Sequence, residues 1–184
     1  GNLNDVLTMG AAVPNWSAPA GGSSTWTTLA DVEISGAPAS LDTGVFAAHN
    51  VLAIYIFARL TVADGQAIIF NSDNGANQYC FRDIRNGTGF STPNYPCIQY
   101  GFAATTNWIN SVWTITQRTS TEKMINGFIT EQTGTASTDI PSQAMHSAMW
   151  RNSADQITRV TLCNSAGVIV NIGTGSRIVV LGAS

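Results

Sequence analysis

"VLAIYIFA", residues Val51–Ala58, is the longest apolar run of the chain and points to its fold class. The run has the length of a β-strand, consists mostly of residues that favour strands, and is closed by Arg59. Because both of its faces are apolar, we expect a central strand that packs on the core and is also covered on its outer face. It is far shorter than the roughly 18 apolar residues of a membrane span, so we expect no membrane insertion.

Similar segments, rich in β-branched and aromatic residues, lie on both sides of this run. Separators such as "SDNGAN", "RNGTG" and "NSAG" supply residues that favour turns. Only "STDIPSQAMHSAMW" has some helical character, and with Pro141 it predicts one short helical turn. We expect strands in "STWTTLADVEIS", "QAIIFNS", "QYCFRDIR", "PCIQYGFA", "SVWTITQR", "KMINGFITEQT", "SAMWRNS", "QITRVTLCN" and "SRIVVLGA".

This succession of short strands, without βαβ alternation, predicts an all-β fold. We expect an antiparallel β-sandwich of jelly-roll type over residues 23–184, preceded by a short extended N-terminal connector over residues 1–22. The chain begins with Gly rather than Met, and we expect it to be a fragment of a longer protein.

The composition predicts a surface with little charge. Charged residues make up 10% of the chain against about 25% in ordinary soluble domains, and Lys123 is the sole lysine. The net charge is -3 and no basic cluster is present, so we expect no nucleic-acid partner.

The sequence offers little catalytic chemistry. The chain has two histidines, His49 and His146. Neither is accompanied by a Gly-x-Ser-x-Gly nucleophile motif or by an acidic residue at a spacing that would indicate a catalytic triad, so we expect no enzymatic activity. Asn71, Asp73 and Asn74 form an oxygen-rich turn that could bind calcium. Because an ordinary Asn/Asp-Gly turn explains the same residues, we expect no metal and no cofactor.

Cys80 and Cys97 bracket the loop-like stretch "FRDIRNGTGFSTPNYP". They could form one disulfide, but three cysteines cannot all pair within one chain. The alternative is that these residues are small, buried apolar side chains.

Aromatic side chains among turn residues are the candidate ligand-binding groups. The expected loop "RNGTGFSTPNYPC" carries Phe90, Asn94 and Tyr95, and exposed aromatic residues in loops favour binding over folding. Trp108 and Trp113 have an odd spacing, so on one strand they would face opposite sides and Trp108 could be exposed. The alternative is that both tryptophans pack the sheet.

Five segments follow one another along the chain: "TWTTLADVEIS", the "IIFNSDNGANQY" turn, a lysine beside "MINGF", "MWRNSADQITRVTLCNSAG", and the close "IGTGSRIVVLGA". In this order they resemble a module of bacteriophage tail-fibre and related attachment proteins. The resemblance spans roughly Trp26 to Gly182. Two positions depart from the pattern: "FNSD" stands where "FNGD" is usual, and Leu181 stands where an aromatic residue is usual.

The stretch "DVLTMGAAVPNWSAPAGG" resembles the connector that joins a phage fibre shaft to its next domain. Its apolar side chains have too little area to form a core alone, but three copies around an axis could bury one another. We therefore expect a homotrimer held together by Val6, Leu7, Val13 and Trp16.

The resemblance implies a phage virion structural protein, whose fibre-terminal domain attaches to a host-surface glycan or protein and contacts other virion proteins. A first alternative is a capsid decoration or head-fibre protein. A second is a carbohydrate-binding module of a secreted enzyme, with sugars stacked on Tyr95 and on Trp26, Trp108, Trp113 and Trp150.

Removing residues 1–22 is expected to weaken trimerisation without unfolding the domain, because the connector lies outside the expected sandwich. Light scattering before and after truncation measures the trimer, and circular dichroism measures the β-structure. A monomer at micromolar concentration with the connector intact would contradict the trimer. Loss of the β-signal on truncation would instead place the connector in the core.

Overall fold

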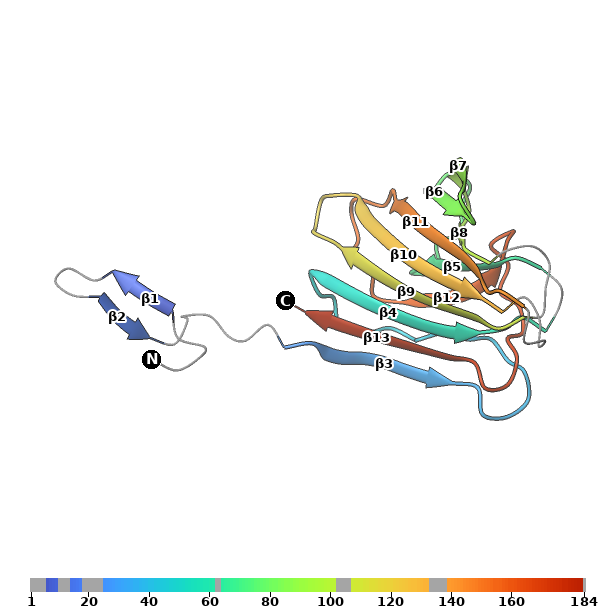
Figure 1. Ribbon diagram of the computed structural model, residues 1–184, viewed down its shortest axis with the longest axis horizontal. Helices are drawn as coiled ribbons and strands as arrows, with labels where there is room; N and C mark the ends of the chain where they lie inside the picture. Colours follow the sequence, from blue (N-terminus) through green and yellow to red (C-terminus); the bar gives the residue numbers. More distant parts are fainter. Residues whose placement is uncertain are drawn as a thin grey trace.

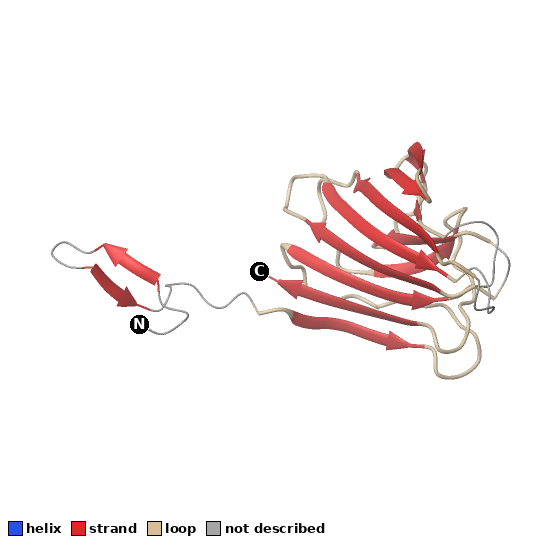
Figure 2. Cartoon of the chain, in the orientation of Figure 1, coloured by secondary structure: helices blue, strands red, loops and turns tan. Residues whose placement is uncertain are grey.

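The structure is a computed structural model, which describes residues 6–9, 14–17, 25–61, 64–101, 107–132 and 139–183. Every regular element of these residues is a β-strand (Figure 2). No helix in this part of the chain is long and apolar enough to cross a membrane. The all-β prediction is therefore confirmed.

Within the described residues, the strands form three antiparallel sheets. An eight-stranded sheet has the order β3-β13-β4-β9-β10-β11-β6-β7, a three-stranded sheet has the order β12-β5-β8, and β1 pairs with β2. The strand bounds are β1 Val6–Met9, β2 Pro14–Ser17, β3 Thr27–Glu33, β4 Val51–Ala58, β5 Gln66–Phe70, β6 Tyr79–Arg85, β7 Thr88–Tyr95, β8 Ile98–Gln99, β9 Ile109–Thr116, β10 Lys123–Glu131, β11 Ser142–Trp150, β12 Val160–Asn164 and β13 Arg177–Ala183.

The chain passes repeatedly between the two larger sheets, which lie one over the other (Figure 1). It leaves the eight-stranded sheet after β4, β7 and β11 to add β5, β8 and β12 to the small sheet. The last strand, β13, inserts between β3 and β4. The architecture is a β-sandwich, but eight strands facing three do not establish the jelly-roll connectivity that we expected.

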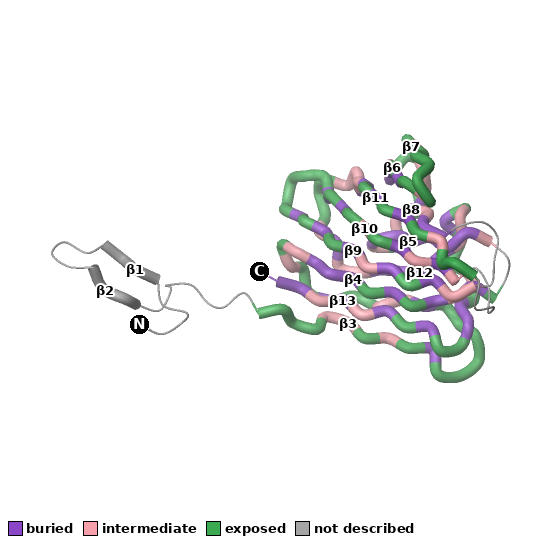
Figure 3. Tube along the Cα trace, in the orientation of Figure 1, coloured by how far each residue is buried: buried purple, intermediate pink, exposed green. Residues whose placement is uncertain are grey.

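Burial alternates along most strands of the large sheet, as Figure 3 shows. In β4, Leu52, Ile54 and Ile56 are fully buried against the core. Tyr55 and Phe57 point the other way and remain 44% and 46% exposed. The central position of β4 is as predicted, but the expected cover on its outer face is wrong within the described residues, because the small sheet covers the inner face only.

Two tryptophans join the sheets. The buried ring of Trp113 in β9 meets the ring of Tyr100, which follows β8, edge to face at 5.5 Å. The buried ring of Trp150 in β11 lies 6.0 Å from Phe70 of β5. Both tryptophans thus carry large apolar area into the core between the sheets.

The β6–β7 hairpin corrects the prediction of a loop at residues 85–97. Asn86 and Gly87 form its two-residue turn, both with positive φ (45° and 85°), and Arg85 pairs with Thr88. Positive φ at both central residues is typical of the Asn-Gly turn that matches the twist of a hairpin. β7 is therefore an edge strand, although its many Gly, Ser, Pro and Asn residues indicated a loop.

The predicted helical turn near Pro141 is also wrong for residues 139–150. Pro141 directly precedes β11, which pairs with β10 over nine residues. In β11 the side chains of Ala144, His146 and Ala148 are buried while their neighbours are exposed or half-buried. This period of two, and not the helical period, decides the structure.

The N-terminal connector contains the hairpin of β1 and β2, in which Val6 pairs with Ser17 and Leu7 pairs with Trp16. Val13 lies outside the described residues. The homotrimer stays a prediction.

Substitution of Gly127 by Ala is expected to destabilise the fold by about 1–3 kcal/mol through overpacking. A Cβ at this position in β10 would lie 2.4 Å from ring atoms of the buried Trp113. Gly89→Ala in β7 is the matched control, because a Cβ there meets nothing within 4 Å. Urea unfolding of both variants measures the difference, and equal stability of the two would contradict the close packing of Trp113.

Candidate functional site

The outer face of the large sheet, which the small sheet does not cover, carries an apolar row. The strand registers place one outward residue of each of six strands side by side: Val179 of β13 next to Tyr55, then Val112, Phe128, Met145 and Ile84. Phe128 is 48% exposed and Met145 is 64% exposed. The row thus runs across the strands and is partly open to solvent.

A second apolar row lies four residues away along the strands. It contains Met124 of β10, Met149 of β11 and Cys80 of β6, which the registers again place side by side. Met124 is 54% exposed, whereas Met149 and Cys80 are half-buried.

A polar row runs between the two apolar rows. Its side chains are shorter than most of those flanking them, except at Arg82, and Ser147 Oγ donates a hydrogen bond to Asn126 Oδ1 at 3.3 Å. We call this row and its apolar flanks the outer trough; the row consists of Thr114, Asn126, Ser147, Arg82 and Ser91, one residue from each of five neighbouring strands.

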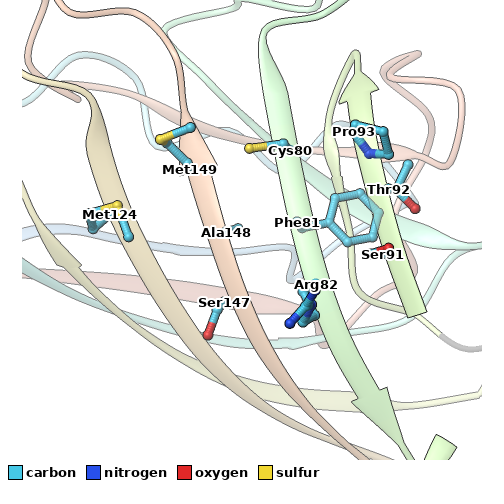
Figure 4. A pocket seen from close by; sticks show the side chains of 10 residues that line it. All are labelled: Cys80, Phe81, Arg82, Ser91, Thr92, Pro93, Met124, Ser147, Ala148 and Met149. Carbon is cyan, nitrogen blue, oxygen red and sulfur yellow. The ribbon is translucent and has the colours of Figure 1, made fainter. Parts of the chain in front are cut away.

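The trough is hollowed on both sides of the polar row. One hollow of about 420 Å³ lies toward Met124 and Met149, and Figure 4 shows that its lining comes from β10, β11, β6 and β7. Another, also about 420 Å³, lies toward Phe128 and Met145. A third lies at the β7 end. Arg82 lines all three hollows, which makes it the common point of the trough.

Arg82 is also the only charged residue among the outward-facing positions of β4, β9, β10, β11 and β6. Within the described residues, no acidic side chain forms an ion pair with its guanidinium, whereas Arg85, Arg159 and Arg177 each pair with an aspartate. A guanidinium presents five N–H donors in a planar fork that suits carboxylate and phosphate groups. The trough therefore holds one uncompensated cation on a neutral face.

The structure separates the ligand-binding residues expected on the β6–β7 segment. Phe90 is 51% exposed and lies under the guanidinium of Arg85 at 5.7 Å. Asn94 accepts a hydrogen bond from Arg151 at 2.6 Å. Tyr95 packs edge to face on the buried Phe81 at 5.8 Å. Only Phe90 borders the trough, at its third hollow, so the three residues form no common site.

Trp108 belongs to another part of the outer face. It precedes β9, stacks on Phe57 at 4.4 Å with nearly parallel rings, and lies under the guanidinium of Arg59 at 4.9 Å. β9 and β7 are four strand spacings apart, about 19 Å at ~4.8 Å per spacing, so Trp108 and Phe90 cannot contact one small ligand together.

Two of the four tryptophans that a carbohydrate-binding module would use to stack sugars cannot be reached by a ligand. Trp113 and Trp150 are fully buried in the core. Trp26 is 50% exposed just before β3, at the opposite edge of the sheet from β7. The structure therefore brings no two of these tryptophans together on the surface.

Two of the candidate calcium residues, Asn71 and Asp73, accept hydrogen bonds from protein groups. Asn71 Oδ1 accepts hydrogen bonds from the backbone N–H groups of Thr158 and Arg159 at 2.9 and 3.1 Å. Asp73 Oδ2 accepts one from the indole of Trp150 at 2.9 Å. Among the residues that the structure describes, no group of three His, Cys, Asp or Glu side chains could hold a metal ion.

His146 and Asp83 form a buried pair that the spacing in the sequence did not indicate. They are register partners in β11 and β6, and Nε2 of His146 lies 3.6 Å from Oδ2 of Asp83, with both side chains fully buried. Asp83 also pairs with Arg85. Burial lowers the pKa of His146 to about 4, against the opposing effect of Asp83. Closed off from solvent, this pair cannot exchange a proton with a bound substrate.

The cysteines are free thiols. Cys80 lies in the second apolar row of the trough, whereas Cys97 and Cys163 are fully buried. The Cys80–Cys97 disulfide considered from the sequence is therefore not formed. The alternative, small buried apolar residues, describes Cys97 and Cys163.

A scan of the chain against known protein families finds no match, and a search among curated proteins finds none either.

The free energy of unfolding is expected to fall by about 3 kcal/mol as the pH falls from 6.5 to 4, because the unfolded chain takes up a proton at His146 that the folded chain resists. The stabilisation that the neutral, buried His146 gives to the folded state is fully present well above pH 6.5 and is lost as the pH falls toward 4. The lowered pKa values of Asp31 and Asp42 reduce the stability further as the pH falls, mainly below pH 4.

Urea unfolding across this pH range measures the effect. His146→Leu is expected to flatten the pH dependence, whereas His49→Gln retains it because His146 is still present. An unchanged slope in the His146 variant would contradict the assignment.

Proposed function

We propose that this chain is a non-catalytic binding domain of a phage virion, which attaches a fibre to the host surface through the outer trough. The observation that carries the proposal is the trough itself, a polar row with one uncompensated arginine between two partly exposed apolar rows. Exposed apolar surface beside a few polar groups that can orient a ligand is typical of binding faces.

The fold supports the same function. The inward side chains fill the core between the sheets, so the outward side chains are free to serve recognition. The resemblance to phage attachment modules points to a host-surface glycan or protein as the ligand. A homotrimer would present three troughs together, and their combined avidity could exceed that of a single site by about 10²–10⁴.

A bulky substitution in the polar row is expected to abolish attachment. Ser147 lines both large hollows, so Ser147→Trp would fill the trough without touching the core. Val168→Trp is the matched control, since Val168 is exposed, lies between β12 and β13, and lines neither large hollow. The assay measures binding of the labelled protein to a panel of bacterial strains, and its competition with phage particles. We expect Ser147→Trp to lose most of the binding and Val168→Trp to keep it.

Three outcomes would contradict the proposal. Equal binding by both variants would place attachment elsewhere on the domain. Binding to empty capsids but to no cells would favour the capsid decoration alternative. Release of sugars from cell-wall material would show an enzyme.

A further inference from the structure

The chemistry of the outer trough identifies the class of ligand. We propose that it binds an acidic saccharide, a chain of pyranose rings that carries a carboxylate or phosphate group, with the acidic group on Arg82. This inference rests on the proposed function, because it names the ligand of the same attachment site.

The charge of the trough selects an anion. Arg82 has no carboxylate partner within the described residues, and the outward positions around it are neutral. The chain as a whole carries a net charge of -3, so its overall field repels anions. Attraction must then come from Arg82 at short range, where a guanidinium and a carboxylate or phosphate form paired, charge-assisted hydrogen bonds.

The neighbouring polar groups suit sugar hydroxyls. Thr114, Asn126, Ser147 and Ser91 present hydroxyl and amide groups, which both donate and accept hydrogen bonds as sugar hydroxyls do. The flanking side chains Met124, Phe128 and Met145 offer exposed apolar surface to the C–H faces of the rings.

The place of the polar row in the sheet favours a saccharide over a peptide. The row crosses the strands, so its groups recur at the strand spacing of about 4.8 Å and can meet successive rings of a bound saccharide. The row also lies mainly within the sheet, where no free strand edge offers main-chain hydrogen bonds to a peptide.

The test uses a matched pair of probes, a β-1,4-linked glucuronic acid hexasaccharide and cellohexaose, which share a backbone and differ in the carboxylate. A phosphate-bearing arm of a glycan array and a hexaglutamate peptide complete the set. The variants are Arg82→Gln and Arg82→Lys, with Arg118→Gln as the control, because Arg118 is exposed after β9 and outside the trough. Calorimetry and the array measure binding.

We expect the protein to bind acidic glycans, of the carboxylate or the phosphate arm, at least about tenfold more tightly than neutral counterparts. Arg82→Gln is expected to remove that preference, so that acidic glycans bind no more tightly than their neutral counterparts. Arg82→Lys should keep part of it, since an ammonium lacks the planar fork. Arg118→Gln should bind like the unsubstituted protein. Circular dichroism verifies that all variants are folded.

Other results would overturn the inference: an unchanged acidic preference in Arg82→Gln, equal binding of the acidic and neutral hexasaccharides, or tighter binding of hexaglutamate than of any saccharide. Adsorption to cells without binding to any saccharide would overturn the inference and leave the proposed attachment function intact. Binding of acidic saccharides without adsorption to any cell would overturn the attachment function and leave the inference intact.

Discussion

The rest of the structure depends on the register of five neighbouring strands of the large sheet, β4, β9, β10, β11 and β6. Because β4, β9, β10, β11 and β6 pair without a shift over their shared length, inward residues align with inward residues across five strands. The same alignment places Trp113 over Gly127 and His146 beside Asp83. A slip of one residue in any strand would exchange its core and surface side chains, so the core and the trough are specified together.

Much of the fold could be predicted from the sequence, because strand period and turn chemistry are local properties. The apolar run at Val51–Ala58 became β4, and the turn residues after Arg85 became a hairpin turn. β7 could not be predicted, because its pairing with β6 outweighs the poor strand propensity of Gly, Ser, Pro and Asn. The helical turn predicted at Pro141 was wrong for a similar reason, because a proline is compatible both with a first helical turn and with the residue before a strand.

The candidate site was hidden for a different reason. Residues of the polar row are far apart in the sequence, as with Arg82 and Ser147, and become neighbours only through strand order. Along each strand they appear as ordinary outward residues of an alternating pattern. The residues expected to bind, such as Phe90 and Tyr95, were identified by local composition, which cannot show that Tyr95 packs on the core. Arg82 could be recognised as a single charge on a neutral face only if the neighbouring strands in the sheet were known.

The alternation along β10 and β11 has a consequence for evolution. Core residues and trough residues alternate along the same strands. Neighbouring positions such as Ser147 and Ala148 are therefore under different selective pressures. Outward substitutions leave core volume unchanged and usually alter stability little. Under the proposed attachment function, a lineage could therefore exchange Asn126, Ser147 or Arg82 and acquire a new host range in a few mutational steps, while the sandwich beneath stays the same.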